Sequence, residues 1–464
     1  MSEEKGRFAY FKQLLIGSTS GLLAAILVIL AFSLGDSGTP NPQPSNSQST
    51  SASPTPSTTP TNARTCSVKE QAADPLLGTL SGVVINATTS EVLWDRDADK
   101  GAAPASVLKL FTAAAALQTL GPNYVVDTKV YADSENPGTI YLVGGGDPTL
   151  SATPQGKQSV YKNAPKLKDL AIKVNAWAKQ NSITITNIVL DNTLFAGGAE
   201  SSKWDPSWPA KELTLGYQSQ VTALQVDGDR ANPYSLTSPR SKTPVMNAGK
   251  KFKAALGVTG ATLSEGEKPA TATEIAKVTS QTIDKWISHM LQVSDNTEAE
   301  FLARLTALKL GYDGSLGSVQ MAIKKSLAST NIDLSAAVFK DGSGESPNNS
   351  VSPNTVTALV GLVLNGFGDF DVINQSLPIA HESGSLASRF GGDNLDAAGK
   401  IRAKTGWIDK GYTLAGIIQG KDGSTLIFAV YAHGDVKDTA RQAIDNLVTG
   451  FYRCGDQLAN EKEQ

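Results

Sequence analysis

Three short segments that are far apart in the chain carry the residue types of an activated serine. Ser106-Val107-Leu108-Lys109 begins a run rich in Ala and Leu, Ser294-Asp295-Asn296 joins two helix-like segments, and Lys404-Thr405-Gly406 opens a pair of strand-like runs. A hydroxyl and an amine three residues apart lie on one face of a helix, within reach of each other. The fold must therefore bring a helix start, an interhelical turn and an edge strand to one point.

Ser106 becomes a nucleophile only if a nearby group accepts its proton. Lys109 can do so where burial beside a second cation depresses its pKa, and a helix start adds a backbone N–H for an oxyanion. Each pattern alone is weak evidence, because Ser159 and Lys162 also match S-x-x-K. The structural alternative for Ser106 is a helix N-cap. K-T-G occurs at 404–406 alone, and the three patterns in this order form a specific signal.

Composition and charge argue against other function classes. Lys and Arg (41) against Asp and Glu (44) give a net charge of −3, so a nucleic-acid partner is not expected. Three His and two Cys are too few for the usual zinc site, and we expect no metal and no other cofactor. A Ser-His-Asp hydrolase has little support, since the chain has no G-x-S-x-G segment.

The longest apolar stretch, residues 14–34, is long enough to span a bilayer. Positive residues precede it, so the chain is predicted to be a single-pass cell-membrane protein with a cytoplasmic tail over 1–13 and an extracellular or periplasmic body. A cleaved signal segment, which would make the protein secreted, is the alternative, because Ala31-Phe32-Ser33 resembles a cleavage site. Residues 35–65, rich in Ser, Thr and Pro, are predicted to be a disordered linker.

Cys66 and Cys454 lie just inside the two ends of the remaining chain. In an oxidising compartment, two such cysteines predict one structural disulfide that ties the ends of the body together. The alternative is a pair of unrelated free thiols.

The rest of the chain alternates strand-like and helix-like runs. Strand-like runs at both ends of the body, with helices between them, predict one catalytic domain that the chain leaves and rejoins. A middle stretch that mixes short strands with helices such as 167–180 predicts a second, inserted domain. The predicted boundaries are 66–127 and 275–457 for the catalytic domain, 128–274 for the insert and 458–464 for a tail.

The three motifs, together with the segments GGGDPTL (144–150), DGSG (341–344) and GKIRAKTG (399–406), resemble the penicillin-binding D-Ala-D-Ala carboxypeptidase family of the S13 type, the penicillin-binding protein 4 group. The resemblance covers nearly all of residues 75–455. It implies an α/β fold, the sandwich of serine β-lactamases and penicillin-binding proteins, in which an antiparallel sheet has helices on both faces. An all-helical subdomain and an inserted second domain complete that architecture.

The resemblance implies a role for each matching residue. Ser106 would attack the carbonyl between two D-Ala residues while Lys109 accepts its proton, and an acyl-enzyme would result. Ser294, helped by Lys404, would relay a proton to the departing D-Ala amine. Asn296 would hold a substrate amide and position Lys109.

The K-T-G segment would bind the substrate. Lys404 and Thr405 offer a cation and a hydroxyl to the terminal carboxylate. The backbone N–H groups of Ser106 and Trp407 would form the oxyanion hole beside Gly406. Two residues depart from the family pattern. Trp407 follows K-T-G, where Thr or Ser is expected, and Glu345 follows DGSG, where a small apolar residue is usual.

The predicted function is that of an exported serine D,D-peptidase with carboxypeptidase or endopeptidase output. Its partners would be peptidoglycan stem peptides ending in D-Ala-D-Ala, and β-lactams would inhibit it covalently because their leaving group stays tethered. No Glu is clearly placed to hold a dedicated hydrolytic water. The alternatives are a serine β-lactamase and a catalytically silent scaffold that binds the cell wall.

Overall fold

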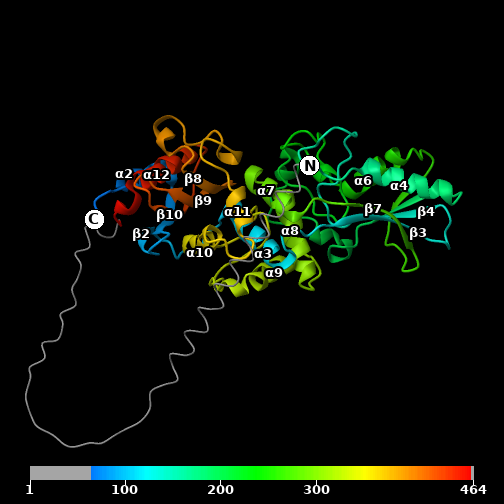
Figure 1. The fold of residues 1–464 in the computed structure, drawn as a ribbon, viewed down its shortest axis with the longest axis horizontal. Coiled ribbons are helices and arrows are strands. Elements are labelled where there is room, and N and C mark those ends of the chain that lie inside the picture. The colour runs from blue at the N-terminus through cyan, green and yellow to red at the C-terminus, as the bar shows by residue number, and fades with distance from the viewer. Residues whose placement is uncertain (1–63, 461–464) are drawn as a thin grey trace, which may run out of the picture. The chain divides into compact units, whose positions relative to one another are not determined.

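The computed structural model describes residues 64–460, which contain two five-stranded sheets (Figure 1). The first sheet has the strand order β2-β1-β10-β9-β8, and the second has the order β6-β5-β4-β3-β7. The strands of the first sheet are β1 (Thr79–Asn86), β2 (Val92–Arg96), β8 (Ile401–Ile408), β9 (Gly411–Gln419) and β10 (Thr425–His433). Those of the second are β3 (Asp127–Ala132), β4 (Thr139–Val143), β5 (Asn187–Asp191), β6 (Thr262–Glu265) and β7 (Thr273–Thr279).

The described helices are α2 (Lys69–Ala72), α3 (Lys109–Leu120), α4 (Leu167–Gln180), α5 (Lys211–Leu215), α6 (Pro244–Leu256), α7 (Ile283–Val293), α8 (Asn296–Lys309), α9 (Ser318–Ser326), α10 (Pro353–Leu364), α11 (Asp371–Ser376) and α12 (Ala440–Cys454). Helices lie on both faces of the first sheet, and α4 and α6 pack against the second.

The first sheet is antiparallel throughout and buried on both faces. Along β10, Phe428 and Val430 join the hydrophobic core that includes α12, whereas Ile427 and Ala429 join the core of α3, α8 and α10. This alternation is the two-residue period of a strand packed between two layers. The predicted antiparallel sheet with helices on both faces is confirmed, and Lys404 lies on its edge strand, β8.

The second sheet is built from residues that lie between α3 and α7 in the sequence. Strands β4, β5 and β6 run parallel, β3 pairs antiparallel with β4 and β7, and α4 and α6 pack against this sheet. The predicted insert, 128–274, contains most of this sheet together with α4 and α6, whereas Phe195, Trp208, Val221 and Ala223 from the same range pack into the core of α3 and α8. The independence of the insert as a domain stays a prediction, because all of the described residues, 64–460, belong to one compact unit.

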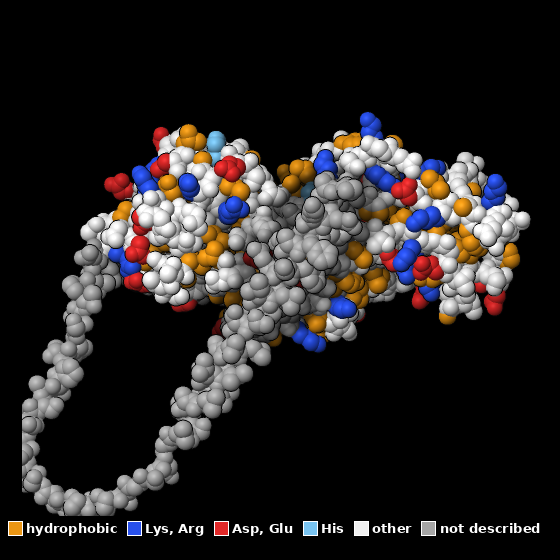
Figure 2. Space-filling model, in the orientation of Figure 1, with side chains coloured by type: hydrophobic (Ala, Val, Ile, Leu, Met, Phe, Trp, Pro, Cys, Tyr) orange, Lys and Arg blue, Asp and Glu red, His pale blue; other side chains and the backbone are white. Residues whose placement is uncertain are grey.

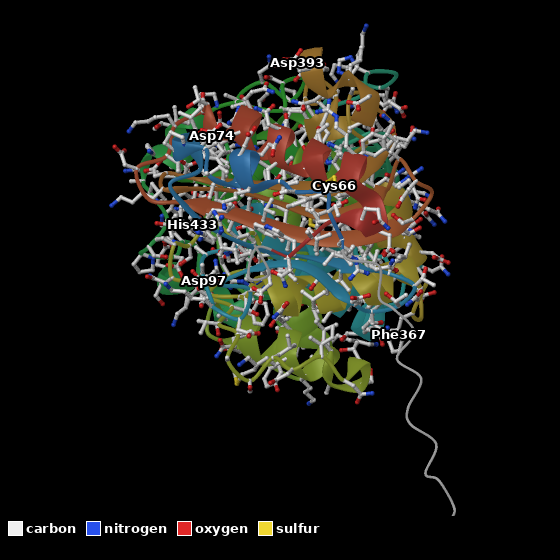
Figure 3. All side chains as sticks on the ribbon, turned by 90° about the vertical axis from the view of Figure 1, so that its left-hand side faces the viewer. Cys66, Asp74, Asp97, Phe367, Asp393 and His433 are labelled. Carbon is white, nitrogen blue, oxygen red and sulfur yellow. A yellow bond between two sulfur atoms is a disulfide. The ribbon has the colours of Figure 1, made fainter. Side chains whose placement is uncertain are left out.

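A disulfide joins Cys66 to Cys454, so the predicted pairing is confirmed. The two Cα atoms are 5.4 Å apart, and the Cys66 N–H donates to the Gln457 carbonyl at 3.0 Å. Figure 3 shows Cys66 beside the end of α12. The bond closes a sequence separation of 388 residues and thereby holds both ends of the described body together.

Replacing Cys66 and Cys454 together by Ala is expected to lower the free energy of unfolding by about 2–4 kcal/mol. The reason is that the unfolded chain regains the freedom that a closed loop of this length denies it. Urea denaturation of the double variant measures the loss, and the wild-type protein under reducing agent should show the same loss. A midpoint that does not move in either case would contradict a structural role for the bond.

The predicted membrane anchor is not supported. Within residues 64–460, no helix is both long and apolar enough to cross a bilayer. The longest of them, α12, has 15 residues, whereas a span needs about 20 apolar ones. The predicted tail over 1–13, the segment 14–34 and the linker up to residue 63 lie outside the described residues. The single-pass placement in the cell membrane, with the membrane as a partner, is therefore withdrawn.

Candidate active site

Ser106 lies in the 3-10 helix η2 (Ala105–Leu108), directly before α3. Its Oγ accepts a hydrogen bond from Lys109 Nζ at 2.8 Å. Thr413 Oγ1 on β9 donates to the carbonyl of Pro104 at 2.8 Å, which fixes the segment that leads into the serine. The hydroxyl therefore faces the cleft described below, while the lysine amine is buried beneath it.

Lys109 is completely buried, and its Nζ donates to three oxygen atoms. Besides Ser106 Oγ, these are Asn296 Oδ1 at 2.6 Å and the Ser343 carbonyl at 2.8 Å. Burial lowers the pKa of Lys109 to about 8, against the opposing charges of Glu345 and Asp341. A substantial fraction of the amine is thus neutral near pH 8 and can accept the proton of the hydroxyl.

The Ser294-Asp295-Asn296 turn joins α7 to α8. Ser294 caps α7 in the left-handed conformation with φ of 60°, and Asp295 Oδ1 accepts from the Glu298 N–H at the start of α8. Lys404 Nζ donates to Ser294 Oγ at 2.8 Å and to the Thr405 carbonyl at 2.7 Å. Burial, and then the nearby Lys109, holds the pKa of Lys404 well below its usual range.

The second carboxylate oxygen of Asp295 is bound from the region of the predicted insert. Arg230 Nη2 donates to Asp295 Oδ2 at 2.7 Å, and both side chains are almost fully buried. Tyr161 Oη accepts from Arg230 Nη1 at 2.8 Å and donates to the same Asp295 oxygen at 3.3 Å. Burial disfavours the Asp295 carboxylate, but Arg230, His289 and Arg240 together outweigh burial, so the pKa of Asp295 lies below its usual range. The turn is therefore held by charges from both parts of the chain.

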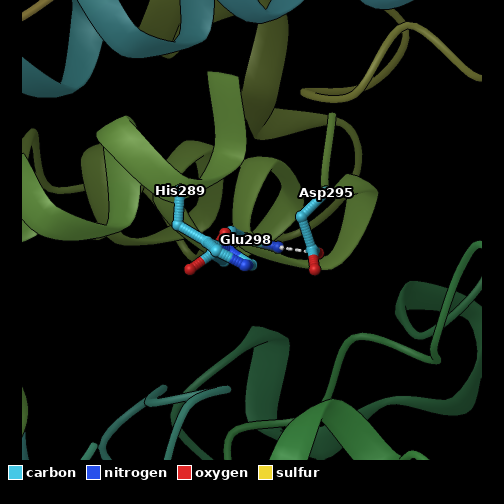
Figure 4. Close-up of side chains that lie close together, drawn as sticks. All are labelled: His289, Asp295 and Glu298. Carbon is cyan, nitrogen blue, oxygen red and sulfur yellow. Dashed lines mark hydrogen bonds and ion pairs between the residues drawn. The ribbon is translucent and has the colours of Figure 1, made fainter. Parts of the chain in front are cut away.

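His289, Asp295 and Glu298 form a cluster behind this turn (Figure 4). Their ligand atoms lie within 4.8 Å of one another, a spacing that suits a metal ion. Both carboxylates are already engaged, however, since Glu298 Oε2 is 2.7 Å from His289 Nδ1 and Asp295 pairs with Arg230. The Arg230 guanidinium supplies the positive charge that a metal ion would bring. We therefore infer that the cluster stabilises the Ser294-Asp295-Asn296 turn.

The K-T-G strand lies directly against the segment that carries Ser106. A Cβ at Gly406 would come within 2.1 Å of Thr413 Oγ1 and 3.0 Å of the Pro104 carbonyl, so only glycine fits there. Thr405 Oγ1 lies 2.8 Å from Ser385 Oγ. The Trp407 ring is 38% exposed and meets Tyr217 edge to face.

These residues surround one cleft with a volume of about 610 Å³. Six of the eight predicted site residues line it, and the other two, Lys109 and Lys404, are buried beneath it with their amines on the lining hydroxyls. The lining also contains residues that the sequence analysis did not place in the site, namely Glu212, Tyr217, Val293, Glu345, Ser385, Ser388, Arg389, Tyr412, Asp438 and Arg441. Only Glu345 carried a sequence signal, as a departure from the usual residue after DGSG.

The DGSG loop forms the wall that faces Lys109. Asp341 accepts hydrogen bonds from Trp208 Nε1 at 2.8 Å and from the Gly344 and Ser346 N–H groups at 2.8 and 2.6 Å. Glu300 on α8 accepts from the Ser343 N–H at 2.7 Å. With these bonds made, the Ser343 carbonyl is fixed where it accepts from Lys109.

A family model described as D-Ala-D-Ala carboxypeptidase 3 (S13) matches residues 65–238 and 229–452. The chain belongs to this family. Among curated relatives, a carboxypeptidase of Mycobacterium tuberculosis is 33% identical over 401 residues, which is 84% of each chain. Carboxypeptidase DacB of Mycolicibacterium smegmatis is 34% identical over 389 residues, which is 82% of each chain.

A solved structure, penicillin binding protein 4 from Haemophilus influenzae, has the same fold as this S13 chain. The TM-score is 0.68 at 19% identity, and the match covers 81% of this chain and 96% of the other. The predicted family, the fold class and the assignment as a serine D,D-peptidase are thus confirmed. The roles of individual residues remain predictions.

On the face of the described body shown in Figure 2, Lys and Arg side chains are interspersed with Asp and Glu side chains. This mixture is ordinary for a protein whose formal net charge is −3.

Proposed function

We propose that this enzyme releases the terminal D-alanine of peptidoglycan stem peptides through an acyl-enzyme on Ser106. The observation that carries the proposal is the 2.8 Å hydrogen bond between Lys109 Nζ and Ser106 Oγ in a cleft bordered by the K-T-G strand. A further relative, from Actinomadura, is named a D-alanyl-D-alanine carboxypeptidase, at 28% identity over 450 residues.

In the acylation step, neutral Lys109 accepts the hydroxyl proton while Ser106 Oγ bonds to the carbonyl carbon between the two D-Ala residues. The backbone N–H groups of Ser106 and Trp407 stabilise the oxyanion. When the C–N bond breaks, the departing amine receives a proton through Ser294, which is hydrogen-bonded to Lys404. Asn296 keeps Lys109 oriented through its Oδ1.

The terminal carboxylate of the substrate is bound at the K-T-G strand. Lys404 lies below the cleft, where a substrate carboxylate would favour the charged form of its amine, and Thr405 supplies a hydroxyl. A β-lactam offers a carboxylate and a strained carbonyl at the same spacing and acylates Ser106 in the same way. A Haemophilus influenzae penicillin binding protein 4 structure that is similar in fold (TM-score 0.63, 19% identity) is complexed with a β-lactam.

Release of D-alanine from diacetyl-L-Lys-D-Ala-D-Ala tests the proposal directly. We expect stoichiometric D-alanine, together with a mass increase of one benzylpenicillin per chain that maps to the peptide containing Ser106. Sustained nitrocefin turnover without D-alanine release would identify a β-lactamase instead. Absence of both release and adduct would identify a silent scaffold.

The rate of acylation is expected to rise with pH through about 8. Lys109 must be neutral to accept the proton, and its pKa is lowered to about 8, so protonation removes the base below that value. The second-order rate of benzylpenicillin labelling, measured between about pH 6 and about pH 10, should fall roughly tenfold per pH unit on the acid side. A flat profile would exclude Lys109 as the base.

A further inference from the structure

Glu345 is a carboxyl group in the cleft that the acylation step does not use. Its side chain lines the cleft together with Ser106, Ser294 and Asn296. Its Oε2 accepts from Asn296 Nδ2 at 3.1 Å, and Asn296 Oδ1 in turn accepts from Lys109. One amide group thus connects the carboxyl with the amine that activates Ser106.

The backbone holds Glu345 close to the nucleophile. The preceding residue, Gly344, has φ of +83°, and a Cβ there would lie 1.9 Å from the Ala105 carbonyl and 3.1 Å from the Ser106 nitrogen. Only glycine permits this approach, and Asp341 fixes it by accepting from the Gly344 N–H. The residue after Gly344 is therefore anchored beside Ser106 by a loop with little freedom to move.

We propose that Glu345 holds and deprotonates the water that hydrolyses the acyl group on Ser106. This inference rests on the proposed acyl-enzyme. Within residues 64–460, no protein group donates a hydrogen bond to Glu345 Oε1, which leaves that oxygen available to a water in the cleft. A general base must lie within one hydrogen bond of the proton that it removes. Hydrogen bonds through Asn296 and Lys109 link Glu345 to Ser106 Oγ, and the proposed water would bridge the remaining gap between the carboxylate and the ester.

The hydrolytic step balances with groups already in the cleft. The water oxygen bonds to the ester carbon while one water proton goes to Glu345. When the tetrahedral oxyanion collapses, the bond between carbon and Ser106 Oγ breaks. Glu345 returns its proton through water to Lys109, and Lys109 passes a proton to Oγ. The products are the shortened peptide acid and the free serine.

Burial raises the pKa of Glu345 to about 7, and the charge of Glu212 adds to this effect while Lys109 opposes it. The carboxylate needed for hydrolysis therefore forms as the pH rises through about 7, below the value at which Lys109 loses its proton. The charged groups that act on Glu345 or line the cleft beside it are Lys109, Lys211, Glu212, Asp341, Arg389, Asp409, Lys410, Asp438 and Arg441.

The test uses diacetyl-L-Lys-D-Ala-D-lactate, an ester with the same acyl group and a better leaving group, so that hydrolysis of the acyl-enzyme limits turnover. In Glu345→Gln, kcat should fall by about 10²-fold or more, and quenched samples should contain mostly acylated enzyme by mass. The acid limb of kcat near pH 7 should disappear. Benzylpenicillin should still label this variant within about tenfold of the wild-type rate, which shows that the site is folded.

Glu212→Gln is the matched variant, since it removes the like charge without removing the base. In the pH profile of kcat for this variant, the acid limb should move to lower pH, and the plateau value should be unchanged. Normal kcat for Glu345→Gln with normal labelling would overturn the role of Glu345 but leave the proposed function unaffected. A rise in KM without acyl-enzyme accumulation would also overturn it and would indicate that Glu345 binds a cationic group of the substrate. Failure of the wild type to form any adduct would instead overturn the proposed function.

Discussion

Ser106→Ala is expected to abolish covalent labelling by benzylpenicillin and to reduce D-alanine release by about 10⁴-fold or more. The Oγ atom that accepts from Lys109 is the atom that forms the ester, and in the described cleft Ser294 Oγ is bound to the second lysine instead. Intact-mass spectrometry after incubation with the antibiotic, with release assayed in parallel, measures both effects.

Ser159→Ala is the matched control for this experiment because Ser159 and Lys162 repeat the S-x-x-K pattern. Ser159 bonds to the backbone of Tyr161, and Lys162 is exposed, so the second pair has no place in the cleft. The Ser159→Ala variant should still be labelled with one antibiotic molecule per chain. Full labelling of Ser106→Ala, or loss of labelling in Ser159→Ala alone, would refute the assignment of the nucleophile.

Arg230→Met is expected to lower the free energy of unfolding by about 3–5 kcal/mol, because it leaves the buried Asp295 carboxylate without its cation. The loss should be accompanied by slower labelling of Ser106, since Asp295 lies between Ser294 and Asn296 in the turn. Urea denaturation gives the first quantity, and labelling kinetics under native conditions give the second.

The double variant Arg230→Met with Asp295→Asn separates a pairing effect from simple loss of packing. Removing both charges should cost much less than the sum of the two single changes, because no unpaired charge remains. Strict additivity would mean that the ion pair contributes nothing to the turn.

The sequence was sufficient for the parts of the site that local patterns encode. Ser106 and Lys109 are three residues apart, and Ser294 and Asn296 share one turn, so each pair could be located without knowledge of the rest of the fold. The strands β1, β2, β9 and β10 likewise follow from short hydrophobic runs with turn residues between them. The family resemblance then supplied the way in which these segments meet.

Contacts between distant segments could not be predicted in this way. Arg230 and Asp295 are separated by 65 residues, and nothing in either local sequence indicates a partner. Glu345 was noticed only as an unusual residue. Its place in the cleft depends on the close approach of Gly344 to Ser106, which lies in another part of the chain. The membrane prediction rested on the length of one apolar segment and on the positive residues before it, and these features carry no information on the body.

The region of the predicted insert contributes directly to the catalytic site. Trp208 donates to Asp341 under the DGSG loop, and Arg230 holds the Asp295 turn. The role of this region, which the sequence left open, thus includes support for two walls of the cleft.

The Cys66–Cys454 bond also decides how the protein responds to mechanical load. Near the two ends of the described body, Cys66 and Cys454 have Cα atoms 5.4 Å apart and are covalently joined. Tension applied between the flanking segments passes through two sulfur atoms and bypasses every hydrogen bond of the sheets. We therefore expect the β1–β10 pairing to bear a load across Cys66 and Cys454 only after the disulfide has been reduced.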